Sequence, residues 1–315
     1  MKPSVVISIK DLLDKQLNIL QGNEQAEHVI INSGFEKIEE LGGFYLGEFA
    51  AIASSSCMGK TKLLVNLALN ISLKNPLLFI SYQHAENAIA KRFLSSISND
   101  ESFTFDTASR FARLKEEEKQ HLMELSDSFN NYHLYINANP PLSLDKLKTY
   151  CVIEIEKNNI QVIMIDGFQY INTGTCNHTT NTDELEYITQ ELKDFALDYN
   201  ICLIVTCPLN RNADKRKGFN NKRPVLSDLK GCGVTEQYTD KIIFIYRPEY
   251  YGFDTDENGN SLINIAEIVV AKNRNGFEGR MFCSMAKGLK SFIEIKPKLL
   301  SDILFYNDSQ NKEKN

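Results

Sequence analysis

The sequence lacks the cysteine pattern of a zinc site and the apolar runs of a secreted or membrane-spanning chain. Its seven cysteines include no C-x-x-C pair, which argues against a structural zinc site and a disulfide framework and favours reduced thiols. No apolar run approaches the about 18 residues that cross a bilayer. The first residues, MKPSVVISIKDLLDK, contain no apolar core of the about 7–15 residues found in signal peptides. We therefore expect a cytoplasmic protein with no membrane partner.

An excess of positive charge is also missing. The chain carries 35 Lys and Arg against 41 Asp and Glu, a net charge of −6. A protein whose whole surface coats nucleic acid is basic, so any such contact must be local here. Residues 211–223 hold six Lys or Arg and one Asp; a solvated loop is the alternative interpretation of this patch. Its candidate DNA-binding cations are Arg211, Lys215, Arg216 and Lys217.

Apolar strands alternate with helices from Glu48 onward. Strands are predicted at 48–54, 76–82, 133–137, 161–166, 202–207, 241–247 and 263–273, with shorter ones near 281–285 and 291–295. Helices are predicted at 61–74, 85–98, 142–159 and 183–200, and within the polar stretch 99–131. Strands that are apolar throughout and separated by helices indicate a parallel sheet covered on both faces. The expected fold class is therefore α/β, with a parallel-rich central sheet.

The two ends of the chain differ from this α/β region. Near the start, one helical stripe gathers Ile9, Leu12, Leu13, Leu17 and Leu20, and such a stripe must be buried somewhere. The other end is polar and is expected to be disordered from about Asn307. We therefore expect a linker helix region at 1–30, a main domain at 31–298 and a polar tail at 299–315.

The stretch ASSSCMGKTK (53–62) joins the first strand of this region to its first helix. It matches the phosphate-binding pattern G-x-x-x-x-G-K-[ST], except that the small residue Ser54 replaces the first glycine. Main-chain N–H groups would point at a β-phosphate, Lys60 would reach the β- and γ-phosphates, and Thr61 would complete a magnesium shell. A coincidental Gly-Lys-Thr helix start is the alternative. The predicted nucleotide-binding residues are Ser54, Ser55, Ser56, Cys57, Met58, Gly59, Lys60, Thr61 and Lys62.

A carboxylate ends a second apolar strand. Asp166 closes QVIMID (161–166), and a carboxylate in that position is costly unless a metal, water or hydrogen bond receives it. We therefore predict that Asp166 and Thr61 hold Mg²⁺. A simple strand-end aspartate is the alternative.

Several segments match one family in order and spacing. They are SGFEKIEELGGFYLGE (33–48), SSSCMGKT (54–61), VIMIDGFQYI (162–171), LNR (209–211), KRPVLSDLKGCGVTEQYTDKIIFIYRPEYY (222–251) and AEIVVAKNRNG (266–276). Together they resemble the C-terminal motor domain of the bacterial replicative helicase DnaB, a RecA-like ring ATPase of helicase superfamily four. The resemblance covers about residues 30–295, and the long run at 222–251 is far more specific than the phosphate loop alone.

The resemblance implies an ATP- and Mg²⁺-dependent motor that acts on single-stranded DNA in replication, with ATP at the subunit interfaces of a hexamer. It gives Lys60 a phosphate role, and Thr61 and Asp166 the magnesium role. Lys272 and Arg274 become cationic fingers that reach the γ-phosphate of the adjacent subunit. Without the family, a solvated charge pair would be the preferred interpretation of these two residues.

The resemblance also implies macromolecular contacts. In this family a linker helix docks on the neighbouring subunit, and residues 5–20 resemble that helix. The family's N-terminal collar, which contacts primase, has no room within residues 1–30, so a loader or primase partner is left open. DNA contact is expected at Lys230, Gly231 and Gly233, where N–H groups and a cation can follow phosphates without reading bases.

Three positions depart from the family's pattern. Gln83 replaces a glutamate that polarises the attacking water; an amide positions water but takes no proton, and a general base contributes typically about 10²–10⁴-fold. Glu86 could replace it only if the loop rearranged. Pro208 replaces a glutamine that senses the γ-phosphate. Lys230-Gly231 replaces an arginine–glutamate pair, which keeps the charge and loses the bidentate fork.

Three functions remain open. The first is a DnaB-like helicase motor with Lys60, Gln83, Asp166, Lys272 and Arg274 as catalytic residues. The second is an ATP-binding, hydrolysis-deficient RecA-like ring or accessory protein that binds DNA or a replication partner. The third, a RecA-like regulatory ATPase that acts on protein partners, is disfavoured by the cations of 211–233.

Overall fold

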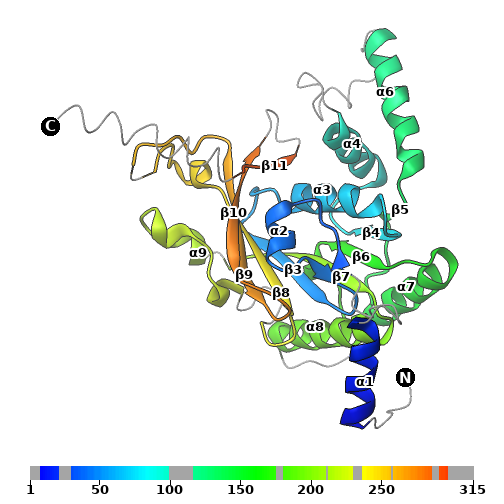
Figure 1. The fold of residues 1–315 in the computed structure, drawn as a ribbon. Coiled ribbons are helices and arrows are strands. Elements are labelled where there is room, and N and C mark those ends of the chain that lie inside the picture. Colours follow the sequence, from blue (N-terminus) through cyan, green and yellow to red (C-terminus); the bar gives the residue numbers. More distant parts are fainter. Residues whose placement is uncertain are drawn as a thin grey trace.

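The central sheet is built from strands that are apolar throughout and buried on both faces. The computed structural model describes residues 8–20, 30–98, 116–174, 180–210, 212–229, 236–256, 258–285 and 291–296. The sheet has nine strands in the order β11-β10-β9-β8-β3-β7-β6-β4-β5 (Figure 1). The parallel strands are β8 (Lys241–Tyr246), β3 (Phe49–Ser54), β7 (Cys202–Pro208), β6 (Val162–Asp166), β4 (Leu77–Ser81) and β5 (Leu134–Asn137). The antiparallel strands are β9 (Ile265–Asn273), β10 (Gly279–Met285) and β11 (Phe292–Glu294).

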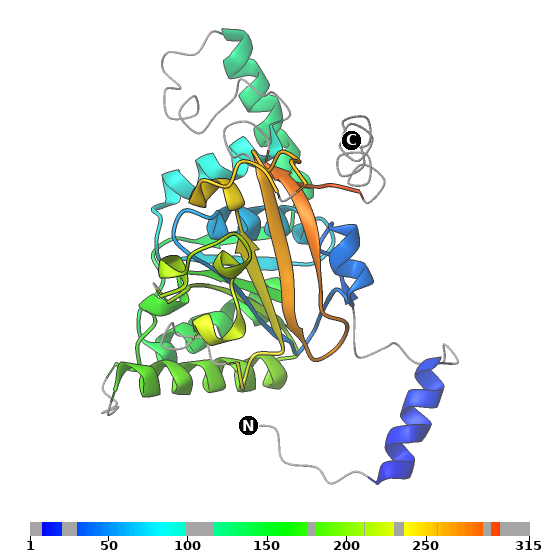
Figure 2. The same cartoon turned by 90° about the vertical axis from the view of Figure 1, so that its left-hand side faces the viewer.

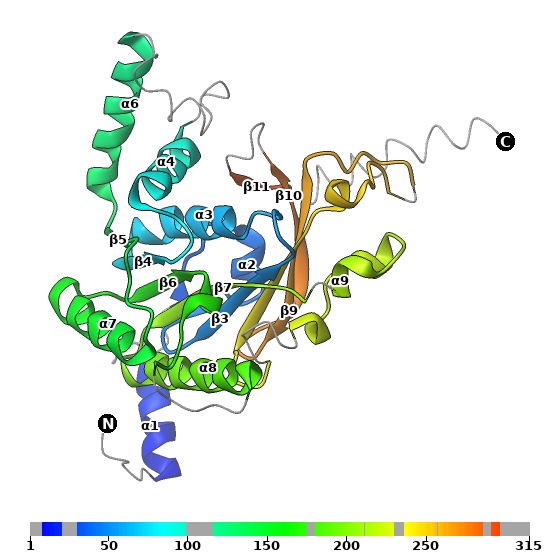
Figure 3. The same cartoon turned by 180° about the vertical axis from the view of Figure 1, so that it is seen from behind.

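Helices cover both faces of this sheet (Figures 1 and 3). One apolar core lies under α2 (Glu36–Glu40), α3 (Lys60–Ser72) and α4 (Glu86–Ile97). The second lies under α7 (Leu144–Asn158) and α8 (Asn181–Asp198). Smaller elements are the antiparallel pair β1 (Ile30–Ile31) and β2 (Phe44–Tyr45), α6 (Glu116–Ser128), which packs on α4, and α9 (Asn212–Lys215). The predicted α/β class with a parallel-rich sheet is confirmed.

The predicted bounds of the main strands and helices lie within two residues of those in the structure. In the polar stretch 99–131, the structure has α6 and a short 3₁₀ turn at Phe129–Asn131, and residues 99–115 lie outside the described part. The elements could be located because the strands are continuous apolar runs and the segments between them have helical patterns. Their order in the sheet is information that only the structure supplies.

The N-terminal helix α1 (Ile9–Leu20) stands apart from the sheet and its covering helices (Figure 2). Its Ile9, Leu13 and Leu17 side chains are 72%, 56% and 52% exposed. The side chains of Leu12 and Leu20, and the predicted tail 299–315, lie outside the described residues. The described part of the apolar stripe is therefore unburied within this single chain. Among the described residues, no helix is long and apolar enough to span a membrane.

A buried ion pair joins the start of the sheet to the segment before it. The Lys241 Nζ lies 3.0 Å from the Glu48 Oε1, and both side chains are almost fully buried. Lys241 also donates to the main-chain oxygen of Gly43 and lies 4.8 Å from the ring centroid of Phe44. Burial raises the pKa of Glu48, and the Lys241 charge opposes that rise. The lysine therefore satisfies two buried acceptors at once.

Removing this lysine should leave a buried carboxylate without its cation. We expect Lys241→Ala to lower the free energy of unfolding by about 3–5 kcal/mol, the usual cost of breaking a buried pair. The matched control is Lys146→Ala at an exposed position of α7, expected within about 0.5 kcal/mol of the wild type. Urea denaturation followed by circular dichroism measures both. A loss of under about 1 kcal/mol for Lys241→Ala would contradict the assigned importance of the pair.

Candidate nucleotide-binding site

The predicted phosphate loop lies at the carboxyl end of β3, between β7 and β8. β3 ends at Ser54 and α3 begins at Lys60, with Gly59 before it at φ 102°. Cys57 is also left-handed, at φ 62°, so the loop is sharply turned. The first N–H groups of α3, at the end of this loop, have no carbonyl partner within the helix, because a helix leaves its first four N–H groups without one. Free N–H groups at the start of a helix form an anion cradle.

Lys60 is folded onto the loop that it closes. Its ammonium donates to the main-chain oxygens of Ser54 and Ser55 at 2.8 and 3.0 Å, and lies 3.3 Å from the Ser54 hydroxyl. Burial lowers the pKa of Lys60, while nearby negative groups such as Asp166 oppose that change. A phosphate in the cradle would give this half-buried cation a charged partner, which two carbonyl oxygens do not provide.

Asp166 is buried at the carboxyl end of β6, beside the loop. The Thr61 hydroxyl donates to its two carboxylate oxygens at 3.1 and 2.9 Å. The Thr206 hydroxyl, from β7, donates to Oδ1 at 2.9 Å and accepts the N–H of Gly167 at 2.9 Å. Asp166 as a whole is 1% exposed. The structure therefore brings the predicted pair Thr61 and Asp166 together.

This donor set fits magnesium. A carboxylate and a hydroxyl are hard oxygen ligands, and Mg²⁺ in nucleotide sites takes most of its ligands from phosphates and water. No group of three or more His, Cys, Asp and Glu side chains that could hold a metal occurs among the described residues. A site that borrows its remaining ligands from a bound triphosphate is consistent with both observations.

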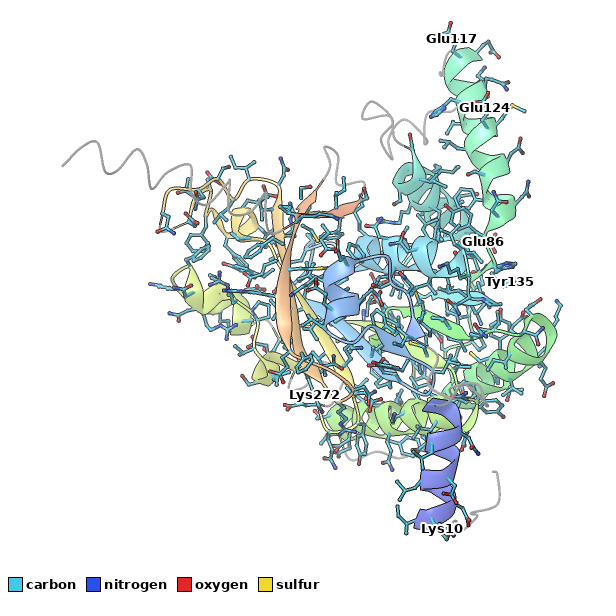
Figure 4. All side chains as sticks on the ribbon, in the orientation of Figure 1. Lys10, Glu86, Glu117, Glu124, Tyr135 and Lys272 are labelled. Atoms are coloured by element: carbon cyan, nitrogen blue, oxygen red, sulfur yellow. The ribbon has the colours of Figure 1, made fainter. Side chains whose placement is uncertain are left out.

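Gln83 lies next to Asp166, just beyond the end of β4. Ser81 of β4 pairs with Asp166, and the N–H of Tyr82 donates to the Asp166 main-chain oxygen at 3.0 Å. A Cβ placed on Gly167 would lie 3.1 Å from the Gln83 Cγ, so the glutamine packs over the turn that follows Asp166. Glu86 does not share this position. Its carboxylate accepts the Asn139 side-chain amide at 3.2 Å, on the β5 side of the molecule (Figure 4).

Pro208 also lies beside the phosphate loop, where the resemblance predicts a sensor. It ends β7 and pairs with Ser54 of β3, at the start of the loop. Leu209, the next residue, donates its N–H to the Ser54 main-chain oxygen at 3.1 Å. A proline ring has no hydrogen-bonding group, so this position holds the backbone and offers nothing polar to a phosphate.

Lys272 and Arg274 lie at the opposite end of the sheet. β9 runs antiparallel to β8, so Lys272 pairs with Ile242 near the start of β8, and Figure 4 shows it beside α8. The Arg274 guanidinium lies 3.5 Å from the Asp240 carboxylate, and Lys272 donates to the Glu236 main-chain oxygen at 2.5 Å. The length of β3, at about 3.3 Å a residue, separates these cations from the phosphate loop of the same chain.

The predicted DNA-binding residues divide into two groups. Arg211, Lys230, Gly231 and Gly233 lie outside the described residues. Lys215 and Lys217 are exposed. Arg216 is half-buried, because it forms an ion pair with Asp228 at 2.7 Å and donates to the Arg223 main-chain oxygen at 3.0 Å. These two contacts join Arg216 to Arg223 and Asp228, which follow it in the chain.

Four residues around the site were not predicted from the sequence. The contact of Thr206 with Asp166 depends on the strand order, because β7 lies beside β6 and brings the Thr206 hydroxyl to this carboxylate. On the other side, Arg92 and His84 are close enough to Asp166 to feel its charge; burial lowers the pKa of both. The fourth, Arg247, donates to the Cys57 main-chain oxygen at 3.3 Å. No local sequence pattern predicts these contacts, because each contact joins segments that are far apart in the chain.

The family model of the DnaB-like helicase C-terminal domain matches residues 31–294. The chain belongs to this family. The predicted resemblance is thereby confirmed, and the matched range includes all nine strands of the central sheet.

Curated relatives of this DnaB-like domain are replicative helicases. The chain is 31% identical to a probable replicative DNA helicase of Trieres chinensis over 78% of its own length and 53% of the relative's. It is 29% identical to the replicative DNA helicase DnaB of Rickettsia typhi, over 95% of its own length and 63% of the relative's. The chain therefore spans a little over half the length of these relatives.

Two solved structures share the DnaB-like fold. A structure described as an ATPase domain matches with a TM-score of 0.80 and 24% identity, over 93% of this chain and 100% of that one. A DnaB-like replicative helicase, described together with its interactions with primase, matches with a TM-score of 0.78 and 23% identity over 93% and 68%. At these identities the likeness establishes the RecA-like fold.

The paired Thr61 and Asp166 give a direct test of magnesium. Asp166→Asn keeps an oxygen acceptor for the threonine hydroxyls and removes the charge, so we expect the fold to remain and the metal-dependent part of ATP affinity to disappear. In the wild type, EDTA should weaken binding of a fluorescent ATP analogue by about tenfold or more, while the variant should bind equally weakly with and without EDTA. An undiminished EDTA response in Asp166→Asn would contradict the assignment.

Proposed function

We propose that this chain is an ATP-dependent, DnaB-like helicase motor that acts on single-stranded DNA in replication and works as a ring of copies, most simply a hexamer. The observation that carries the proposal is the separation of the two halves of its catalytic site. The phosphate loop and Asp166 lie at one end of the sheet, and Lys272 and Arg274 lie at the other. A complete site then needs two copies.

Each side chain has a distinct part in the proposed reaction. Lys60 would turn from the loop carbonyls to the phosphates of ATP, Thr61 and Asp166 would hold Mg²⁺, and Gln83 would orient the attacking water. Bound Mg²⁺ supplies charge neutralisation at the β- and γ-phosphates. Arg274 of the adjacent copy would leave Asp240 and stabilise charge on the transferred phosphoryl group.

The N-terminal helix supports assembly. We take residues 1–30 as a linker that carries α1 and 31–298 as the motor unit, with 299–315 as a tail. The Ile9, Leu13 and Leu17 side chains of α1 are exposed in the single chain, and burial of one such side chain against a partner contributes about 1.5–3 kcal/mol. Docking of α1 on the adjacent copy would bury this stripe, in keeping with the family.

Single-stranded DNA would be bound through phosphates. The proposed contact set is Arg211, Lys215, Arg216, Lys217, Lys230, Gly231 and Gly233, of which Lys215 and Lys217 are exposed. One basic segment in an acidic chain suits contact with a single strand at one place on each copy. Contact with primase or a loader is a further proposal that follows from the family alone.

The main alternative is a ring or accessory protein that binds ATP without turning it over. Gln83 and Pro208 favour it, because the amide takes no proton and the proline offers no donor beside Ser54. Binding groups and fingers are nevertheless retained. Steady-state ATP hydrolysis, measured with and without single-stranded DNA while light scattering reports assembly, separates the two functions. Hydrolysis stimulated by DNA supports the motor, and its absence in assembled protein supports the alternative.

The placement of the fingers predicts complementation between defective copies. Lys60→Ala and Arg274→Ala should each abolish ATP hydrolysis alone, since each destroys one half of every site. Mixed in equal amounts, they should recover up to about a quarter of wild-type hydrolysis, the fraction of interfaces with both halves intact in a closed ring. Arg274→Ala alone should still bind ATP with nearly wild-type affinity. Mixtures that assemble but stay inactive would argue against a site shared between copies.

The substituted base predicts a gain of function. Gln83→Glu places a carboxylate beside Asp166 and Gly167, and we expect kcat for ATP to rise by about tenfold or more. The KM for ATP should change little, because Gln83 is not part of the phosphate cradle. A matched Gln83→Ala variant should lower kcat. If the Gln83→Glu variant and the wild type had equal kcat values, a group other than residue 83 would be activating the attacking water.

A further inference from the structure

One acidic side chain of the basic segment touches the phosphate loop. We define the basic segment as residues 212–223, which begin with α9. The Ser55 hydroxyl donates to the Asp214 Oδ1 at 2.7 Å, and the Tyr251 hydroxyl donates to the same oxygen at 2.6 Å. The Tyr251 hydroxyl also lies 3.3 Å from the Ser55 Oγ. Two hydroxyls, one from the loop and one from the turn after β8, thus converge on one carboxylate.

The rest of the basic segment is attached to this cluster. Lys222 donates to the main-chain oxygen of Asp214, and its ammonium lies 4.7 Å from the ring centroid of Tyr251. Arg216, two residues after Asp214, is paired with Asp228 at 2.7 Å. A displacement of Asp214 would therefore break the hydrogen bond of Lys222 to the Asp214 main-chain oxygen and pull on the Arg216–Asp228 pair that follows α9.

Nucleotide binding would act on this cluster through charge. In the structure, Lys60 is folded onto the Ser54 and Ser55 carbonyls, and the Asp214 charge is one of those that oppose the lowering of the Lys60 pKa by burial. A triphosphate would draw Lys60 away and place several negative charges beside Ser55. Asp214 is then a like charge at one hydrogen bond from the loop, so its contact becomes less favourable when the loop is filled.

We propose that Asp214 senses occupancy of the phosphate loop and transmits it to the basic segment. When the loop is empty, the carboxylate holds α9 and Lys222 against Ser55 and Tyr251. When Mg-ATP fills the loop, the carboxylate is repelled, α9 moves away, and the Lys222 ammonium becomes available to a phosphate of single-stranded DNA. The sensing step depends only on nucleotide binding, whereas the DNA step rests on the proposed function.

Two substitutions separate the charge of Asp214 from its hydrogen bonds. Asp214→Asn keeps an oxygen that accepts both hydroxyls and removes the charge, while Asp214→Ala removes both. The matched control is Asp198→Asn, the same change at an exposed position of α8. Circular dichroism and thermal unfolding of all four proteins verify that each is folded.

Hydrogen exchange of amides in 212–223 reads the sensing step inside the protein. A non-hydrolysable ATP analogue with Mg²⁺ should raise the exchange rate about tenfold in the wild type and in Asp198→Asn. In Asp214→Asn the rise should be about twofold or less. Asp214→Ala should exchange fast both with and without the analogue. By linkage, Asp214→Asn should also bind the analogue about tenfold more tightly. A wild-type exchange response in either Asp214 variant would overturn the proposal.

Fluorescence anisotropy with a labelled oligothymidylate reads the DNA step. We expect the analogue to tighten wild-type DNA binding by about tenfold, and Asp214→Ala to bind DNA tightly with or without it. If the wild type bound no single-stranded DNA at low salt, the proposed DNA function would fail, and the exchange and nucleotide titrations would still decide whether Asp214 is a sensor. If DNA binding depended on nucleotide equally in every variant, the release of Lys222 would be excluded.

Discussion

The proposed chemistry of this chain depends on a buried carboxylate that two threonine hydroxyls hold in place. Asp166 would be costly in its position without Thr61 and Thr206, which come from α3 and β7 on either side of it. These contacts exist because β6, β7 and β3 lie side by side and end at the same edge. Strand order thus determines where the phosphate loop, the metal ligands and Gln83 meet.

Two of the three positions that depart from the resemblance lie beside the proposed nucleotide site. They are Gln83, at the position expected to polarise the attacking water, and Pro208, at the position expected to sense the γ-phosphate, while Lys60, Thr61 and Asp166 match the expected pattern. Both altered side chains nevertheless keep their places next to Asp166 and Ser54. ATP binding and ATP turnover are therefore properties to measure separately in this chain.

Much of the fold could be predicted from the sequence, because its strands are continuous apolar runs that are distinct from the helices between them. The loop at 53–62 and Asp166 were also predictable, since each has a local signature at a strand end. Thr206, Asp214 and Arg247 were not, because their contacts depend on which strands are neighbours and on turns that fold back over long distances. The ion pair of Arg216 with Asp228 was not predictable either, because its basic neighbourhood gives no sign of it; its contact with DNA stays a prediction.

The hydrogen-bonded ladder from β3 through β8 to β9 joins the phosphate loop at one end to Lys272 and Arg274 at the other. Sheets of this kind deform little along their strands, so the ladder acts as a stiff strut. In the proposed ring, a tilt of the sheet caused by nucleotide at one site would move Lys272 and Arg274 at the neighbouring site, and bending of the sheet would absorb little of that movement. If the proposed ring forms, neighbouring nucleotide sites would be mechanically coupled through this ladder, and such coupling would favour hydrolysis at successive sites in turn.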